Sequence, residues 1–415
     1  SSPCSPCLRV EVVRRSQFAR SPFVMFEDAP MNTLPRRLFL NLSAGALCCA
    51  SLHAAEEPVG KTRYRAVIIG HTGQGNYGHG MDVCFSKRDD VEVVAVADPD
   101  EAGRTKAAQR AGAPRHYADY REMLKQEKPQ LVSVAPRWSE QHHAMTLAAL
   151  QAGAHVYSEK PFTVTLAEAD ELVDLAAKSN LKITVAHQMR LSPNVLHLKK
   201  LIDDGAIGQL RELRAHGKQD KRVGGEDLLV LGVHLFNLMH FFGGPAQSCS
   251  ARVKWQGRDI TKADARTIAE KIGPVAGDDI SAQYEFGAGV KGFFLSSAEN
   301  RPAGPWALEL IGTKASAKIA ADIPPKTFLK SENEWKPVPG DPTLVANTNT
   351  PAAGFPSANG RMVEDLLAAI KEKRDPACSG RDAMKAHEMV MAVYCSALSG
   401  APVSLPLQQR THPLL

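Results

Sequence analysis

Lys160 occupies a position in the sequence at which its side chain could take part in a reaction. It lies directly before Pro161, just after the largely apolar run 154–158. Proline disfavours the helical region for the residue before it, so we expect Lys160 at a strand end, with its ammonium at a ligand-binding sheet edge. A fixed cation there could stabilise a developing negative charge. The alternative is that Glu159 and Lys160 are surface charges that close a strand.

His234 is the second candidate, and it lies in the apolar segment 224–240, which we expect to be a helix. An imidazole can accept or donate a proton near neutral pH. Asp227 precedes it by two helical turns, so we expect both side chains on roughly the same face. A lone histidine among hydrophobic residues is often a core residue, but the pairing with Asp227 favours a site.

The glycine-rich loop at 70–80 follows a short β-branched run, 64–69, and precedes a helix-compatible segment, 81–85. Its glycines have the spacing of a dinucleotide fingerprint, in which absent side chains let the backbone approach a pyrophosphate at a helix N-terminus. The residues that we assign to the cofactor are Gly70, Thr72, Gly73, Gln74, Gly75, Asn76, Tyr77 and Gly78. The alternative is a tight turn without a ligand.

Asp98 ends the next predicted strand, 91–97, at the distance from the glycines that the fingerprint requires. A carboxylate there would accept hydrogen bonds from the adenosine ribose hydroxyls and would repel a 2′-phosphate. The sequence therefore predicts NAD rather than NADP as the cofactor, although Arg104 could offset part of the repulsion.

The elements that must position these residues alternate between strands and helices along the first half of the chain, as a doubly wound parallel sheet requires. The predicted strands are 64–69, 91–97, 131–135, 154–158 and 181–186, with a short extended link at 116–117. The predicted helices are 102–111, 120–127, 141–152 and one that follows the capping box Thr165–Glu168. We predict a Rossmann domain over 61–187.

The second half changes to a strand-rich pattern. We predict strands at 211–216, 253–255, 280–286, 290–296, 307–311 and 316–319, and helices at 194–203, 362–371 and 383–398. This pattern indicates an α/β domain with an open, largely antiparallel sheet over 188–406, followed by a tail at 407–415. Because such a sheet leaves one face open, we expect a homodimer or a homotetramer.

Residues 1–60 lie outside the predicted fold. Met31 is a plausible start, and Arg36 and Arg37 precede a short run of small and apolar residues, which resembles a twin-arginine export signal. The run is too short to span a bilayer stably, so we expect a periplasmic protein without a membrane span in its mature form. A cytoplasmic protein with a disordered leader, or an uncleaved anchor, is the alternative.

Charge and cysteine content exclude other classes. The formal net charge of +5 is spread without a basic block, so we expect no nucleic-acid partner. Beyond the leader, the widely separated cysteines are Cys84, Cys249, Cys378 and Cys395. Their spacing indicates neither a metal site nor a disulfide framework, so we expect small core residues.

Taken together, the chain from Tyr64 to Pro406 resembles the Gfo/Idh/MocA oxidoreductase family. The matching segments are the glycine loop, Asp98, 136–142, 149–161, 187–193, 224–234 and 379–406, and Glu159-Lys160-Pro161 after a strand is the most specific of them. The resemblance implies a nucleotide-binding domain, a second α/β domain with an open sheet, and a nicotinamide cofactor that can be tightly bound.

The resemblance also implies residue roles. Lys160 would contact both the nicotinamide ribose and a substrate hydroxyl, and His234 would serve as acid or base. The matching segments also place His142, Glu159 and Gln188 at the cofactor and Arg190 at the substrate, and Asp227 or Glu226 would take the substrate contact of the aspartate that the chain lacks at position 230. The chain departs from the family at Val230, where relatives commonly have an aspartate four residues before the histidine, and at Arg137-Trp138, where many have small residues.

We therefore predict an NAD-dependent oxidoreductase acting on a sugar or polyol. His234 would take the hydroxyl proton while a hydride passes to NAD, and Lys160 would stabilise the alkoxide. One alternative is an exported glycosidase that oxidises its sugar transiently with NAD. Another is a sugar-binding relative without catalysis, which the valine at position 230 would allow.

Overall fold

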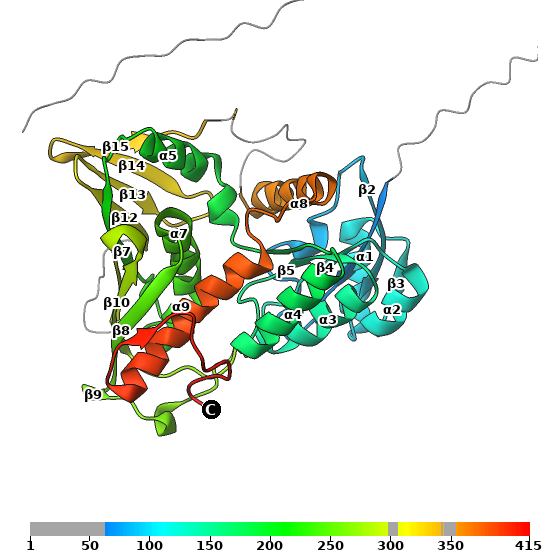
Figure 1. The fold of residues 1–415 in the computed structure, drawn as a ribbon. Helices are drawn as coiled ribbons and strands as arrows, with labels where there is room; N and C mark the ends of the chain where they lie inside the picture. The colour runs from blue at the N-terminus through cyan, green and yellow to red at the C-terminus, as the bar shows by residue number, and fades with distance from the viewer. Residues whose placement is uncertain (1–62, 298–305, 342, 344–353) are drawn as a thin grey trace, which may run out of the picture. The chain divides into compact units, whose positions relative to one another are not determined.

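Two β-sheets organise the part of the chain that the computed structural model describes, which comprises residues 63–297, 306–341, 343 and 354–415. All of these residues belong to one unit, Gly60–Leu415. Figure 1 shows the first sheet with its helices and the second sheet with its own, joined by the helix α9. The predicted leader and export signal lie outside the described residues.

The first sheet is parallel throughout and has the strand order β3-β2-β1-β4-β5-β6 of a Rossmann fold. Its strands are β1 (Tyr64–Ile69), β2 (Val91–Ala97), β3 (Arg115–Tyr117), β4 (Leu131–Val134), β5 (His155–Ser158) and β6 (Ile183–Val185). The central strands are buried on both faces, as their β-branched runs predict. The predicted parallel sheet is confirmed.

Helices cover both faces of this sheet. They are α1 (Glu101–Ala111), α2 (Tyr120–Glu127), α3 (His142–Gln151) and α4 (Leu166–Lys178). Thr165 and Glu168 form the predicted capping box at the start of α4. The buried residues of that helix are Leu166, Ala169, Leu172, Val173 and Ala176.

The helix α8 (Gly354–Glu372) belongs to the second half of the sequence but packs on the first sheet. Its residues Met362, Val363 and Leu366 share a hydrophobic cluster with Ile68 of β1 and with the residues after the glycine loop. The helix predicted at 362–371 exists, but it completes the layer over the first sheet. The spacing of apolar residues along the helix predicts an apolar stripe, but it does not determine which of the two sheets that stripe covers.

The second sheet is mixed and mostly antiparallel, with the order β15-β14-β13-β12-β7-β11-β10-β8-β16 and with β9 paired to β8. Among the described strands of this second sheet, only the pair of β7 and β11 is parallel. The strands are β7 (Leu210–His216), β8 (Ala246–Trp255), β9 (Arg258–Asp259), β10 (Asp279–Phe286), β11 (Lys291–Ser297), β12 (Ala307–Gly312), β13 (Ser316–Ala320), β14 (Lys326–Ser331), β15 (Glu334–Val338) and β16 (Val403–Ser404).

The predictions missed part of this sheet. The first residues of β8, from Ala246, are small or polar and carry no strand pattern, yet they pair with β10 along its length. The hairpin of β14 and β15 was also missed, because its lysines, glutamate and proline are uncommon in strands. Pairing with a neighbouring strand overrides these weak local preferences.

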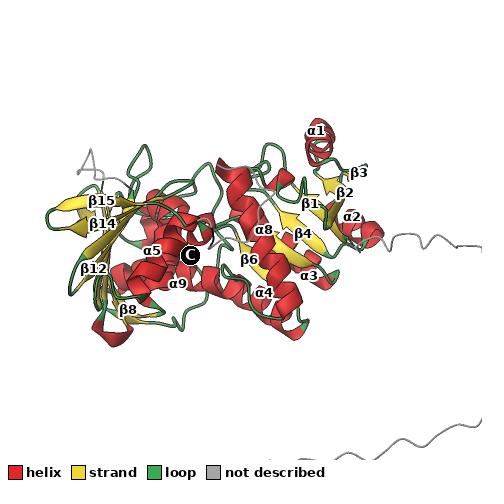
Figure 2. Cartoon of the chain, turned by 90° about the horizontal axis from the view of Figure 1, so that it is seen from above, coloured by secondary structure: helices red, strands yellow, loops and turns green. Residues whose placement is uncertain are grey.

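Apart from α8, the helices of the second half lie on one face of the second sheet. They are α5 (Pro193–Asp203), α6 (Gly225–Asp227), α7 (Val233–Gly243) and α9 (Gly380–Ser399), with a π-helical turn, η4 (Leu228–Gly232), between α6 and α7. In Figure 2, α5 and α9 lie on the same side of this sheet. Burial alternates along β7 and β10, so the opposite face is more exposed in this chain.

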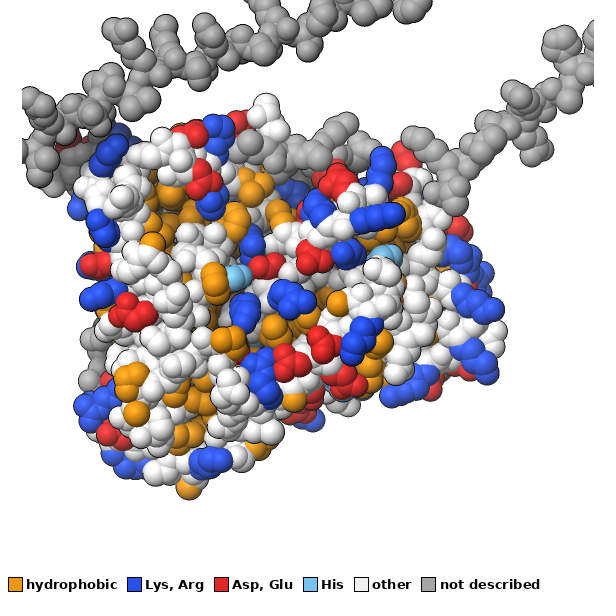
Figure 3. All heavy atoms as spheres, viewed as in Figure 1, with side chains coloured by type: hydrophobic (Ala, Val, Ile, Leu, Met, Phe, Trp, Pro, Cys, Tyr) orange, Lys and Arg blue, Asp and Glu red, His pale blue; other side chains and the backbone are white. Residues whose placement is uncertain are grey.

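Other surface features are ordinary. On the face drawn in Figure 3, basic and acidic side chains are interspersed. None of the helices in the described ranges has the length and hydropathy of a membrane span. The four cysteines outside the leader are free thiols, and three of them are buried.

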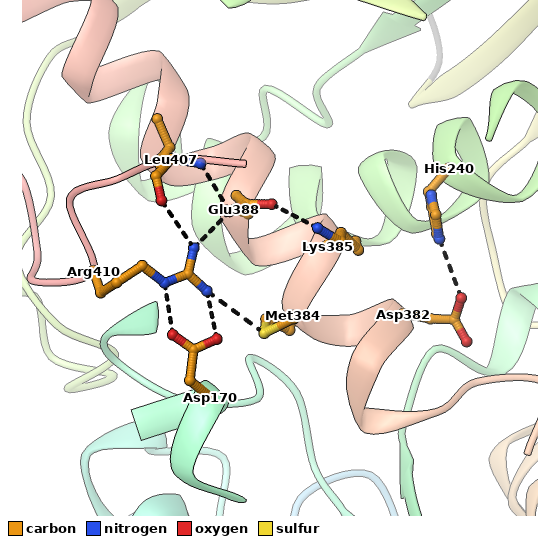
Figure 4. Close-up of polar contacts among 8 residues, drawn as sticks. All are labelled: Asp170, His240, Asp382, Met384, Lys385, Glu388, Leu407 and Arg410. Carbon is orange, nitrogen blue, oxygen red and sulfur yellow. Dashed lines mark hydrogen bonds and ion pairs between the residues drawn. The ribbon is translucent and has the colours of Figure 1, made fainter. Parts of the chain in front are cut away.

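The C-terminal segment is tied to both halves by Arg410 (Figure 4). Its guanidinium bonds both carboxylate oxygens of Asp170 on α4 at 2.6 Å, and it bonds Glu388 on α9 at 2.6 Å. Glu388 is buried, and it also accepts hydrogen bonds from Lys385 and from the amide of Leu407. The residues that we separate as a tail are therefore packed against α4 and α9.

We predict that Arg410→Met lowers the free energy of unfolding by about 2 kcal/mol. The substitution leaves the buried carboxylate of Glu388 with fewer hydrogen-bond donors, while the partial exposure of Arg410 limits the loss. Urea unfolding measures the effect, and adding Glu388→Gln to Arg410→Met should recover part of it. Equal stability of Arg410→Met and the parent protein would refute the structural role of this contact.

Candidate active site

A cavity of about 280 Å³ opens beside the carboxyl ends of the first sheet. Its lining combines loops after β1, β4, β5 and β6 with residues of the second half of the chain. The lining residues are His79, Arg137, Lys160, Gln188, Met189, Lys218, Arg222, Val230, Leu231, His234, Glu270, Trp306, Asp322, Ile323 and Phe355. This is the edge at which parallel sheets bind ligands.

Lys160 lies just after β5, and the structure confirms its place at a strand end. The residue is 7% exposed, its ammonium donates to the carbonyl of Val230 at 3.0 Å, and its amide donates to Glu159 at 2.7 Å. The peptide to Pro161 is cis. Burial lowers the pKa of Lys160, and the neighbouring charge of Glu159 opposes that effect. A cation is thus fixed in the cavity wall.

Glu159 supports this lysine and does not line the cavity. Its carboxylate is fully buried between His79, which it bonds, and the amide of Lys160. Burial disfavours the charged form, but the hydrogen bond and charge of His79 outweigh it and lower the pKa of Glu159 to about 2. We expected a cofactor contact here, whereas the structure gives the carboxylate a role in positioning.

His234 lies in the first turn of α7 and lines the same cavity as Lys160. Its ring is 5.4 Å from that of His187, edge to face, and 6.0 Å from that of Trp306. Its Nδ1 has no hydrogen-bond partner among the described residues. Burial, and then the charge of Lys160, hold the pKa of His234 well below its usual value. The imidazole is therefore neutral near pH 7 and able to accept a proton.

Asp227 does not pair with His234, contrary to our expectation. Its carboxylate is buried and accepts hydrogen bonds from Ser296 at 2.7 Å and from the amides of Lys218 and Gln219. The π-helical turn between the two residues changes the rotation per residue, so a spacing of seven no longer puts both side chains on one face. The carboxylate fixes the loop after β7 and is not part of the cavity lining.

The glycine loop folds into a tight turn. His71 and Asn76 pair through their backbones, and the side chain of Asn76 accepts from the amide of Gly73 at 3.0 Å. Gly73 has a φ of +80° and open space around it, so the backbone can be approached there. Gln74 is exposed on the turn and its carbonyl accepts from the side chain of Gln141.

Other glycines of the loop serve close packing within the protein. Gly75 has a φ of +93°, and a Cβ there would lie 2.6 Å from the amide nitrogen of Arg137. A Cβ on Gly78 would lie 2.7 Å from the carbonyl oxygen of Ala135, and one on Gly70 would overlap the ring of Tyr77. The glycines thus let the loop lie against the segment after β4.

The helix predicted at 81–85 is reduced to a three-residue 3₁₀ helix, η1 (Met81–Val83). The glycine loop therefore leads into a short 3₁₀ turn and not into the longer helix that follows the loop in the fingerprint. Tyr77 is buried under Gly70, and burial and then the neighbouring carboxylate of Asp98 raise the pKa of its hydroxyl. The polar residues of the loop favour turns over a longer helix.

A second pocket, of about 430 Å³, lies at the ends of β1 and β2. It is lined by Gly70, His71, Ala97, Asp98, Pro99, Ala118, Asp119, Tyr120, Arg121, Glu140, Gln141, Ala144 and Met145. The carboxylate of Asp98 accepts hydrogen bonds from the amide of Thr72 at 2.9 Å, from its hydroxyl at 2.7 Å and from the amide of Asp100 at 2.9 Å. Thr72 therefore orients the acid that we assign to the ribose.

The pocket at Asp98 and the cavity at Lys160 together fit a dinucleotide. The glycine loop begins at the pocket, which His71 lines, and reaches the cavity, which His79 lines. A carboxylate has room for more hydrogen bonds than the three that Asp98 accepts. The adenosine end would then lie at Asp98 and the nicotinamide end near Lys160, connected along the open backbone at Gly73.

Three further predicted residues have other surroundings. His142 is fully buried, with ring nitrogens 2.6 Å and 2.7 Å from the carbonyl oxygens of Pro136 and Pro161. Gln188 lines the cavity and donates to Asn359 of α8 at 3.0 Å. Arg190 is not in the lining, because its guanidinium lies over the ring of Phe241 and pairs with Asp382 at 3.4 Å.

Several lining residues were not predicted. Arg137 was noted only as a departure from the family pattern, and Lys218, Arg222 and Glu270 lie in loops without a motif. A signal for Arg137 was present, because it follows directly after a buried strand at the sheet edge that binds ligands. The others become neighbours only through the fold.

The chain matches one protein family in both of its halves. Residues 64–187 match the oxidoreductase family with an NAD-binding Rossmann fold, and residues 199–405 match the C-terminal alpha/beta domain of the same family. Together these segments cover most of the chain, so the protein belongs to the Gfo/Idh/MocA oxidoreductase family.

Some of the similar proteins have names that specify a sugar or a sugar derivative, and others, such as the trans-1,2-dihydrobenzene-1,2-diol dehydrogenase of Bos taurus, do not. A D-apiose dehydrogenase of Paraburkholderia graminis is 25% identical over 340 residues, which are 78% of this chain and 86% of that one. A D-glucoside 3-dehydrogenase of Escherichia coli is 30% identical over 195 residues, 44% of this chain and 55% of that one. A levoglucosan dehydrogenase in complex with NADH and levoglucosan has a TM-score of 0.68 at 19% identity, covering 83% of this chain and 100% of the other, and shows the shared fold.

We predict a steep loss of stability as the pH falls from about 6.5 towards 4. Burial lowers the pKa of His187 and His412 to about 3, and that of His155 and His387 to about 4. An unfolded histidine titrates near 6.5, so below that pH the unfolded chain binds protons that the folded one does not. Urea unfolding at a series of pH values measures the slope.

A matched pair of variants measures how much one histidine, His187, contributes to the pH dependence of stability. His187→Asn removes a buried histidine and should flatten the slope below pH 6 by about 1 kcal/mol per pH unit. His116→Asn changes an exposed histidine in the same way and serves as the control. Identical slopes in the two variants would contradict the assignment of buried neutral histidines.

Proposed function

We propose that this protein oxidises a hydroxyl group of a sugar or polyol with NAD, or catalyses the reverse reduction. The observation that carries the proposal is that Lys160 and His234 line one cavity at the end of the glycine loop that leads from the Asp98 pocket. The names of three similar proteins, which are dehydrogenases of D-apiose, of a D-glucoside and of levoglucosan, support the substrate class.

The residues of the cavity have separate roles in the proposed oxidation. A bound nicotinamide would accept the hydrogen of the substrate carbon as a hydride. Lys160 holds its Nζ in the cavity wall, where a positive charge stabilises the oxygen of the substrate as its proton leaves. His234, neutral because of its burial, accepts that proton. Val230 contributes its carbonyl to hold Lys160, so the position that departs from the family pattern still takes part in the site.

Lys160→Met tests this division of roles. We expect kcat to fall by at least two to three orders of magnitude, because the fixed charge at the reacting oxygen is lost. NAD binding should be retained, since the Asp98 pocket and the glycine loop are unchanged. Nicotinamide absorbance with a panel of sugars measures the rate, and fluorescence titration measures NAD binding. An unaffected rate would remove Lys160 from the mechanism.

We further propose NAD rather than NADP as the cofactor. Asp98 places a buried carboxylate in the adenosine pocket, where a 2′-phosphate would meet like charge and desolvation. Asp98→Asn keeps an acceptor for Thr72 and removes the charge. We expect the ratio of NAD to NADP affinity to fall at least tenfold in this variant. An unchanged ratio in parallel titrations would refute the role of the charge.

We also propose export and self-association. Export is supported by Arg36-Arg37 and the small-residue run after them, which lie outside the described residues. Residues 1–60 fused to a reporter should carry it to the periplasm, and retention in the cytoplasm would count against a signal.

Self-association as a homodimer or homotetramer is supported by the open face of the second sheet, where Leu295 is 43% exposed. A monomer in sedimentation would contradict it.

A further inference from the structure

Four basic side chains line the cavity, and three of them have partners. Lys160 donates to the carbonyl of Val230. Arg222 bonds Asp220 at 2.6 Å, and Lys218 lies 3.7 Å from the same carboxylate. Arg222 and Lys218 therefore share one carboxylate, whereas Lys160 is held by a neutral carbonyl.

Arg137 is the exception. Its guanidinium has no carboxylate within ion-pair distance in the described part of the chain, although the side chain is partly buried in the cavity wall. Burial lowers the pKa of Lys160 most, the charges of Glu159 and Glu270 raise it, and those of Arg222 and Arg137 lower it further. Keeping two cations together in a partly desolvated cavity is unfavourable unless an anion joins them.

The backbone fixes where Arg137 lies relative to Lys160. The amide of Arg137 donates to the carbonyl of Gly75 at 3.1 Å, which anchors its loop to the glycine loop. His142 contacts the carbonyl of Pro136, just before Arg137, and that of Pro161, just after Lys160. One buried histidine therefore holds the two basic residues at a set separation.

We propose that Arg137 binds a carboxylate of the substrate, so that the enzyme acts on acidic sugars or polyols. This inference rests on the proposed function. A guanidinium presents paired donors that match a carboxylate, and the pairing contributes both affinity and orientation. The substrate would then be held at its carboxylate by Arg137 while Lys160 and His234 meet a hydroxyl elsewhere on it.

Size and charge favour a small monoanion. The cavity of about 280 Å³ has to hold the nicotinamide as well as the substrate, which limits the substrate to a small molecule. One guanidinium without a partner matches the single charge of a carboxylate better than the double charge of a phosphate. Glu270 and Asp322 in the same lining can accept hydrogen bonds from hydroxyl groups.

Matched sugars test the proposal on the NAD-loaded protein. The pairs are D-glucuronate with D-glucose and D-galacturonate with D-galactose, with glucose 6-phosphate as a further anion. We expect the acid of at least one pair to raise the melting temperature more than its neutral partner, and to be oxidised with a kcat/KM at least tenfold higher. Equal behaviour of both members in both pairs, or a preference for the phosphate over both acids, would overturn the proposal.

Variants then assign the preference to Arg137. Arg137→Met should reduce the preference for the acid by about ten- to a hundredfold, as expected for the loss of a charged hydrogen-bonding pair. Arg137→Lys should keep part of it, because it keeps the charge without the fork. The control is Arg252→Met, which removes an exposed guanidinium paired with Asp259 on the second sheet and should keep the full preference.

The outcomes separate this inference from the proposed function. If no sugar changes the nicotinamide absorbance but the acid still stabilises the protein through Arg137, the oxidoreductase proposal fails and the acid site stands. If Arg137→Met weakens NAD binding and leaves the preference for the acid intact, Arg137 serves the phosphates of the cofactor and the acid site is refuted.

Discussion

The site depends on the burial of one ammonium group. Removing a cation from water is costly, so the ammonium of Lys160 requires a partner, and it finds the carbonyl of Val230 at 3.0 Å in the other half of the chain. This contact sets the end of β5 against the π-helical turn that leads into α7. His234 follows four residues after Val230, so the same contact brings the proton acceptor to the cation.

Around this contact, buried polar groups tie the loops together. Glu159 is held by His79 from the glycine loop, and His142 joins the loops that follow β4 and β5. The glycine at position 75 allows the loop to press on the backbone of Arg137. The pocket at Asp98 and the cavity at Lys160 are consequently parts of one rigid arrangement, which suits a reaction that needs two ligands aligned.

The sequence predicted the parts that follow local rules. β-branched runs that alternate with helical segments predicted the parallel sheet, and the capping box of Thr165 and Glu168 predicted the start of α4. It failed where distant packing decides: α8 crosses to the first sheet, and the π-helical turn separates Asp227 from His234. The cations from loops, above all Arg137, carry no periodic signal, so their gathering in one cavity was visible only in the structure.

The central claim is that hydrogen passes from a substrate carbon to a nicotinamide in the cavity of Lys160 and His234. Transfer of deuterium tests it most directly. The protein is incubated with NAD and with a panel of sugars, sugar acids and polyols that carry deuterium on carbon. Mass spectrometry then measures the mass of the reduced cofactor. The account predicts that the reduced cofactor carries one deuterium from its substrate. Reduced cofactor without the label would contradict it, as would sugar binding that never labels the nicotinamide.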